Sequence, residues 1–303
     1  MKVTKPHFGR RIPVQRHLHC TQKPQSLQNQ FLAILQVVQR ELHAFSPFLQ
    51  RKNRHLLHQS DAHIVSLHLL GKWLGFTSER AWHRLVQGNL GSIVERSRYN
   101  RRGRDLRYAL KWLRKRLTSQ HGSGAYSIID SLPLSLCHPI RIRRVRCFRQ
   151  QADVGYCASK QSHYYGFKLH MQVDSLGWIQ SYVLSAASIH DVQVAEDVLR
   201  QAPFPLVLGD KGYLSEPLHV HLEQALGIVL CVPTRSNSKK QRWTPAFTRW
   251  MGRKRKQIET VFSLLIRRFA LTSIRSRSLS GLEGHIDGIL LAYTLWKIGV
   301  ISD

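Results

Sequence analysis

Acidic residues are scarce in this chain. Its 303 residues include 18 Asp+Glu against 46 Lys+Arg, which gives a formal net charge of +28. A protein this basic is expected to bind a polyanion. Residues 1–125 have 23 Lys+Arg and 5 Asp+Glu, whereas residues 126–303 have 23 and 13, so the amino-terminal part is the more basic. A hydrophobic content of 43% predicts a packed globule rather than a basic tail.

Cysteines and long apolar runs are also few. The five cysteines are odd in number and include no C-x-x-C pair, so the sequence predicts reduced thiols and no zinc site. The longest apolar stretch, residues 289–301, contains Lys297 and is too short to span a bilayer. The amino terminus has positive charge without the apolar segment of a signal peptide. We therefore expect a soluble, cytoplasmic protein with no membrane partner.

The first third of the chain has the pattern of helices. Residues 1–25 are basic and rich in His and Pro, without periodicity, so we expect a poorly ordered arm. Apolar residues at helical spacing predict helices over residues 26–45, 60–74 and 79–86, and a further helix over 106–117. Three short helices with a turn at Gly75 resemble a helix-turn-helix. A plain helical bundle explains the same pattern equally well.

An arginine-rich segment follows these helices. Its five arginines are Arg96, Arg98, Arg101, Arg102 and Arg104. The acids close to them in the sequence are Glu95 and Asp105. Because a guanidinium can donate two hydrogen bonds to one phosphate, we favour a contact with the DNA backbone over a solvated charge run. Gly122–Gly124 then indicates a linker, which divides a helical DNA-binding domain (26–121) from a second domain (125–303).

The second domain alternates strands and helices. Strands are predicted over residues 126–130, 165–173, 178–186, 205–209 and 227–232. Helices are predicted over 191–200, 216–226 and around Glu259, with a last one ending near Gly299. The strand at 165–173 alternates apolar and polar residues, which predicts that one of its faces is exposed. The element order is that of an α/β fold with a ribonuclease-H-like mixed sheet, preceded by a mostly helical domain.

Three carboxylates stand out against the basic background. Asp130 and Asp210 each close a predicted strand, and Glu259 lies where a cationic helix becomes apolar. In the predicted topology the first and fourth strands are neighbours, so the two aspartates would lie together, with the helix completing the cluster. Three adjacent acids repel one another unless cations compensate. Two Mg²⁺ ions, for which Mn²⁺ can substitute, would do so and would favour in-line displacement at phosphorus.

Asp191 is the competing candidate for the second acid. It opens a predicted helix, and an aspartate there accepts hydrogen bonds from backbone N–H groups. We therefore interpret Asp191 as a helix cap and prefer Asp210. Lys168 and Lys211 are candidate phosphate contacts, and a solvated lysine is the alternative for each.

Four segments together resemble the transposases of bacterial insertion sequences. They are Ile129–Leu134, Tyr165–His170, Gly209–Tyr213 and Arg255-x-x-x-Glu259. The most similar group is the insertion sequence 982 family, within the Asp-Asp-Glu superfamily. The resemblance covers roughly residues 60–300. At Gly252, three residues before Arg255, some relatives have a tyrosine, so this chain departs from the longer pattern.

The resemblance implies a ribonuclease-H-like domain that cleaves DNA and transfers strands at the element's terminal inverted repeats, with divalent metal. It implies that Asp130, Asp210 and Glu259 are catalytic and bind the metal, and that Arg255 lies near the scissile phosphate. It also implies a homodimer on double-stranded DNA, associated with the bacterial nucleoid. A nuclease of the same fold that joins no strands, or a catalytically silent DNA-binding descendant, remains an alternative.

Overall fold

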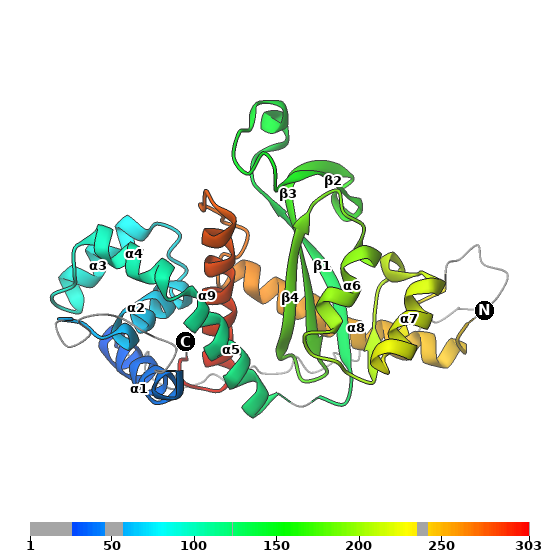
Figure 1. The fold of residues 1–303 in the computed structure, drawn as a ribbon, viewed down its shortest axis with the longest axis horizontal. Coiled ribbons are helices and arrows are strands. Elements are labelled where there is room, and N and C mark those ends of the chain that lie inside the picture. The colour runs from blue at the N-terminus through cyan, green and yellow to red at the C-terminus, as the bar shows by residue number, and fades with distance from the viewer. Residues whose placement is uncertain (1–25, 46–56, 123, 235–241, 303) are drawn as a thin grey trace, which may run out of the picture.

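The computed structural model describes residues 26–45, 57–122, 124–234 and 242–302. The arm predicted for residues 1–25 lies outside the described residues. The described chain is a mixed α/β fold in which the first four helices and the sheet lie on opposite sides of one helix, α9 (Leu279–Lys297) (Figure 1). Among the described residues, no helix is both long enough and apolar enough to cross a membrane.

The helical part confirms the predicted helices and adds one. Its helices are α1 (Leu27–Phe45), α2 (Asp61–Trp73), α3 (Glu79–Asn89), α4 (Arg96–Asp105) and α5 (Arg107–His121). Ser60 and Ser78 cap α2 and α3, because each hydroxyl accepts a hydrogen bond from a backbone N–H three residues later. The arginine-rich segment, for which no helix was predicted, forms α4. Its first turn is capped by the carboxylate of Glu95, which accepts from Ser97 N.

The sheet has the predicted neighbours and one further strand. Its strands are β1 (Ser127–Ser135), β2 (Asp153–Cys157), β3 (Ser162–Asp174), β4 (Ile179–Ala186), β5 (Leu206–Leu208) and β6 (Val229–Cys231). The order is β2-β3-β1-β5-β6, and β4 also pairs with β3. β1 is antiparallel to β3 and parallel to β5, so the sheet is mixed. β2, which was not predicted, is a short antiparallel partner of β3.

Helices cover both faces of the sheet. Ile128 packs in the cluster that includes α8 (Pro245–Arg267) and α9, whereas Ile129 packs with α6 (Asp191–Leu199) and α7 (Glu216–Leu226). The two neighbours belong to different clusters because successive strand residues point to opposite faces.

The prediction that one face of β3 is exposed is wrong. Gln172 is fully buried on that face, where it donates to Ser127 Oγ and accepts from Ser181 Oγ. α6 covers this face, and the hydrogen bonds allow polar residues to be buried under it.

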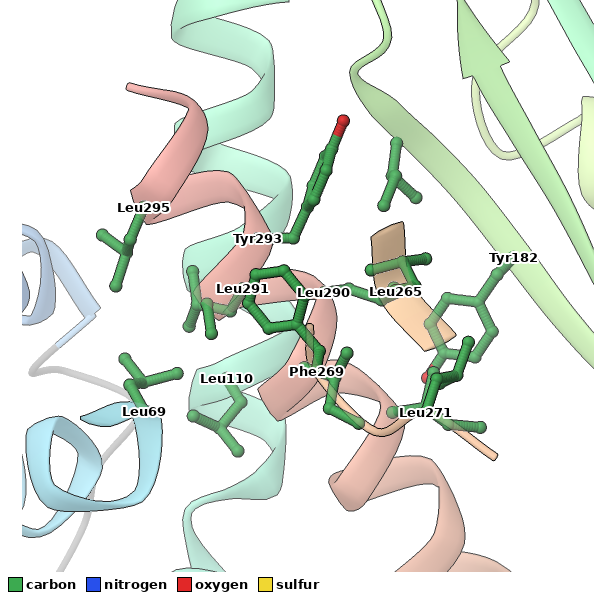
Figure 2. Close-up of a cluster of buried hydrophobic side chains, with 14 of the residues drawn as sticks. Leu69, Leu110, Tyr182, Leu265, Phe269, Leu271, Leu290, Leu291, Tyr293 and Leu295 are labelled. Atoms are coloured by element: carbon green, nitrogen blue, oxygen red, sulfur yellow. The ribbon is translucent and has the colours of Figure 1, made fainter. Parts of the chain in front are cut away.

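α9 links the helical part to the sheet. Figure 2 shows Leu290 and Leu291 of α9 between Leu69 and Leu110 on one side and Tyr182 of β4 on the other. All five belong to one hydrophobic cluster, which contains residues from both predicted domains. The boundary at residues 122–124 stays a prediction, and the hydrophobic core is continuous across it.

A buried ion pair reinforces this junction. Arg114 of α5 is fully buried, and its Nε lies 3.4 Å from Oδ1 of Asp287 in α9. Its Nη1 also donates to the carbonyl of Ile179 in β4, and the guanidinium lies over the ring of Tyr182. Removing one partner of such a pair leaves an uncompensated buried charge. The pair therefore ties α5, α9 and the sheet together.

Candidate active site where β1 and β5 meet

Asp130 and Asp210 lie side by side because of the register of two parallel strands. Ile128 of β1 pairs with Leu208 of β5, and each aspartate follows its paired residue by two positions. Asp210 is the second residue after the end of β5, and it directly precedes the short 3₁₀ helix Lys211–Tyr213. The prediction that Asp130 ends its strand is wrong, since β1 continues to Ser135 in register with β3. The two aspartates nevertheless lie together, because each is two residues past the paired position. β5 has ended before Asp210, whereas β1 continues past Asp130.

Arg255 of α8 joins the two aspartates. Its Nη1 lies 3.1 Å from Oδ1 of Asp210, and its Nη2 lies 3.7 Å from Oδ2 of Asp130. The Asp130 side chain is 21% exposed, and that of Asp210 is 49% exposed, so the pair is open to solvent on the Asp210 side. One guanidinium shared between two carboxylates leaves the group with a net negative charge.

The surroundings of Asp130 favour its protonated form. Burial is the main cause and raises the pKa of this carboxyl to about 6, and the charges of Asp210 and Asp191 act in the same direction. The backbone N–H of Ser131 and the guanidinium of Arg255 lower the pKa, but they offset only part of the rise. A carboxylate held in an unfavourable environment in this way is typical of a functional site.

Asp191 is a third acid beside this pair, and the helix-cap interpretation of it is wrong. The cap position of α6 is His190, and no side chain caps the helix. Asp191 Oδ1 accepts from Lys168 Nζ at 3.0 Å, and Oδ2 accepts from Ser131 Oγ at 3.2 Å. The partners of Asp191 come from two neighbouring strands. Ser131 of β1 pairs in register with His170 of β3, and Lys168 is two residues from His170. Only this pairing brings Ser131 and Lys168 close enough to share Asp191.

The ammonium of Lys168 is already occupied by partners within the protein. In addition to the ion pair with Asp191, its ammonium donates to the carbonyl of Ile189 at 2.8 Å. Its role as a phosphate contact stays a prediction. To bind a phosphate, Lys168 would have to give up its ion pair with Asp191. Lys211, by contrast, is exposed immediately after Asp210.

Glu259 does not join the aspartates in this structure. It lies on α8 one turn after Arg255, and its side chain is exposed. Within the described ranges it forms no ion pair with Arg255, and no three His, Cys, Asp or Glu residues are close enough together to hold a metal ion. Two of the three predicted acids are therefore brought together, and the third is on the adjacent helix.

The aspartate pair suits a hard divalent cation. Carboxylate oxygens are the preferred ligands of Mg²⁺, which keeps several waters and needs only one or two carboxylates from the protein. Asp130 and Asp210 provide these oxygens at a partly exposed position. The guanidinium of Arg255 now supplies the positive charge between them.

The arginines of α4 divide into exposed and buried side chains. Arg96, Arg98, Arg101 and Arg104 are exposed. Arg102 is buried, and its Nη2 donates to Oδ1 of Asp61 at 2.7 Å, so it attaches α4 to α2. The prediction of a DNA contact therefore does not fit Arg102, because a helix must turn some side chains of a continuous run inward.

One family model matches the chain over residues 121–279, and that family is described as a transposase DDE domain. The matched region contains Asp130, Asp210, Arg255 and Glu259. No curated protein and no solved structure matches the chain.

Proposed function

This chain belongs to the transposase DDE domain family, and from that membership we propose that it is a DNA transposase of the insertion sequence 982 group, with a ribonuclease-H-like catalytic domain. Its reaction would be cleavage and strand transfer at the terminal inverted repeats of a mobile element. The observation that carries this proposal is the parallel register of β1 and β5, which places Asp130 beside Asp210.

In this proposal Asp130, Asp210 and Glu259 hold two Mg²⁺ ions, or Mn²⁺ in their place. When bound, the ions supply activation of a water or 3′-hydroxyl and stabilisation of the leaving oxygen. Asp130 and Asp210 are already adjacent. Glu259 must approach them by a rearrangement of its exposed side chain or of α8. We propose that DNA binding causes this rearrangement.

Arg255 has two successive partners in the proposed cycle. Without substrate it neutralises the aspartates, which would otherwise repel each other. With substrate its guanidinium is positioned to pair with a phosphate close to the scissile bond. Lys211, exposed beside Asp210, is a second candidate contact with the same strand.

The basic helical part is the proposed DNA-binding surface. The exposed arginines Arg96, Arg98, Arg101 and Arg104 contact the backbone of the terminal repeat, and α2 and α3 are the candidate helix-turn-helix. We also propose that the protein acts as a homodimer that pairs two ends, in the bacterial cytoplasm at the nucleoid. The high positive charge supports double-stranded DNA as the partner.

An assay with labelled donor DNA ends, target DNA and Mg²⁺ tests the proposal. A transposase yields joined product that depends on metal. A nuclease of the same fold yields nicked DNA without joining, and a catalytically silent descendant shifts the DNA in a gel and leaves it intact. Either of these last two outcomes would replace the proposed function.

A further inference from the structure

A second feature of the molecule is a cavity on the helical side, away from the aspartates. Its volume is about 410 Å³, and it is bounded by α2, the start of α3, α4, α5 and the amino-terminal end of α9. Neither the candidate acids nor Arg255 lines it. A cavity of this size is large enough for a small ligand or for part of a polymer.

The cavity lining is strongly cationic. Its charged residues include Lys72, Arg104, Arg107, Arg275 and Arg277. Glu79 is the one carboxylate among the lining residues. Among the described residues, none of these five cations forms an ion pair with a carboxylate. The lining therefore attracts an anion.

Lys72 and His285 define the floor of the cavity. Lys72 Nζ lies 2.9 Å from Nδ1 of His285. An ammonium only donates, so Nδ1 accepts and the neutral imidazole has its proton on Nε2. That Nε2 is buried without a hydrogen-bond partner in the described structure, so it is a donor without an acceptor. Burial lowers the pKa of His285 to about 3, which keeps the ring neutral.

Lys72 holds its charge in an unfavourable place. Burial lowers the pKa of its ammonium to about 8, and the charge of Glu79 offsets only part of this effect. A cation that is largely withdrawn from water and has no carboxylate partner is costly to stability. An anion bound in the cavity would remove this cost.

The helix α9 directs further donors to the same place. This 19-residue helix begins at Leu279, and Ser278 caps it by accepting from Gly281 N. Ser280 and Gly281 line the cavity, so the positive end of the helix dipole faces the cations. Backbone N–H groups at such a helix end bind phosphates.

We infer that this cavity binds the phosphate group of a nucleotide, either within a DNA strand or free in solution. The floor offers the ammonium of Lys72 and the Nε2–H of His285, the rim offers Arg275 and Arg277, and α9 offers backbone donors. All of these are donors, and a phosphate supplies the acceptors. The site is separate from the proposed catalytic centre and does not depend on metal.

Calorimetric titration of the full chain in metal-free buffer tests this inference. The ligands are inorganic phosphate, deoxyadenosine monophosphate and a short DNA duplex. The variants are Lys72→Met, which removes the charge and keeps most of the unbranched side chain, and Arg275→Gln with Arg277→Gln, which changes exposed residues only. The control is Arg141→Gln with Arg143→Gln, which removes the same charge from exposed positions outside the cavity.

We expect each cavity variant to weaken binding by roughly ten- to a hundred-fold, as for the loss of a charged hydrogen bond. Loss of mononucleotide binding identifies a free nucleotide as the ligand, and a loss confined to the duplex identifies a strand phosphate. Lys72→Met should unfold at no lower temperature than the parent. Equal affinities in the cavity variants and the control, for all three ligands, would overturn the inference and leave the catalytic proposal unaffected.

Discussion

Arg255 lies between Asp130 and Asp210, with Nη1 3.1 Å from Oδ1 of Asp210 and Nη2 3.7 Å from Oδ2 of Asp130. The guanidinium thus occupies the position between two carboxylates where a divalent cation would bind. Cation and guanidinium compete for the same oxygens, so removing one should strengthen binding of the other.

Metal binding should therefore be detectable without DNA. We expect saturating Mg²⁺ or Mn²⁺ to raise the free energy of unfolding of the parent protein by about 2.7 kcal/mol at a hundred times the dissociation constant. Arg255→Gln should bind the metal more tightly, because the competing charge is gone. The measurement is thermal unfolding at increasing metal concentration. Asp130→Asn with Asp210→Asn is the control, and an undiminished metal response in it would contradict the assignment.

Asp130 should destabilise the metal-free protein near neutral pH. Its pKa is about 6 in the folded protein, against 3.8 as the ordinary value, so the folded state binds the proton more tightly. The free energy of unfolding then falls as pH rises from about 4 to 6, and the loss is complete above that range. We expect Asp130→Asn to stabilise the protein at pH 7 by up to about 3 kcal/mol, and by nothing at pH 3.5.

Urea unfolding in buffer with chelator, at both pH values, measures this difference. Glu223→Gln, at an exposed position, is the matched control and should change stability by less than about 0.5 kcal/mol. A lower stability of Asp130→Asn at pH 7 would show that the carboxylate is a structural residue.

Glu259→Gln should abolish cleavage while DNA affinity stays nearly unchanged. The side chain is exposed and forms no ion pair with the described residues, so its loss should not unfold the protein. Loss of a metal ligand should reduce the rate by more than about 100-fold. Single-turnover cleavage and a gel-shift titration measure the two quantities, with Glu223→Gln again as the control. Metal-dependent cleavage at the parental rate would remove Glu259 from the site.

DNA binding should weaken steeply with salt, because many phosphates are neutralised. Arg98→Gln with Arg101→Gln should lower the slope of log affinity against log salt by about 2, one for each lost contact. Arg141→Gln with Arg143→Gln provides a comparison of equal charge. If both pairs change the slope equally, α4 is not the specific contact surface.

The buried pair of Arg114 and Asp287 should be essential to stability. Asp287→Ala leaves the buried guanidinium without its carboxylate and should cost about 3–5 kcal/mol. Replacing both residues, as Arg114→Met with Asp287→Leu, should recover most of this loss, since no buried charge then remains. Denaturant unfolding of the two variants separates the effect of the pair from that of packing.

Local pattern in the sequence was sufficient for most helices and strands. Apolar spacing predicted α1, α2 and α3, and in the structure serines cap the latter two. The topology expected from the order of strands and helices predicted that β1 and β5 are neighbours, which is the basis of the aspartate pair. β2 and α4 were missed, because a short strand and a polar helix have little apolar periodicity of their own.

The sequence by itself determined the basic charge and the scarcity of acids, and it placed Asp130 in one strand, Asp210 close to the end of another and Glu259 on a helix. Only the tertiary structure decided what each of them faces. It placed Arg255 between the two aspartates. It also brought Asp191 into contact with Lys168 and Ser131, and it buried Arg102 against Asp61. Periodicity along a chain specifies which side of an element a residue occupies. The partner on that side comes from another element, and packing brings the two together.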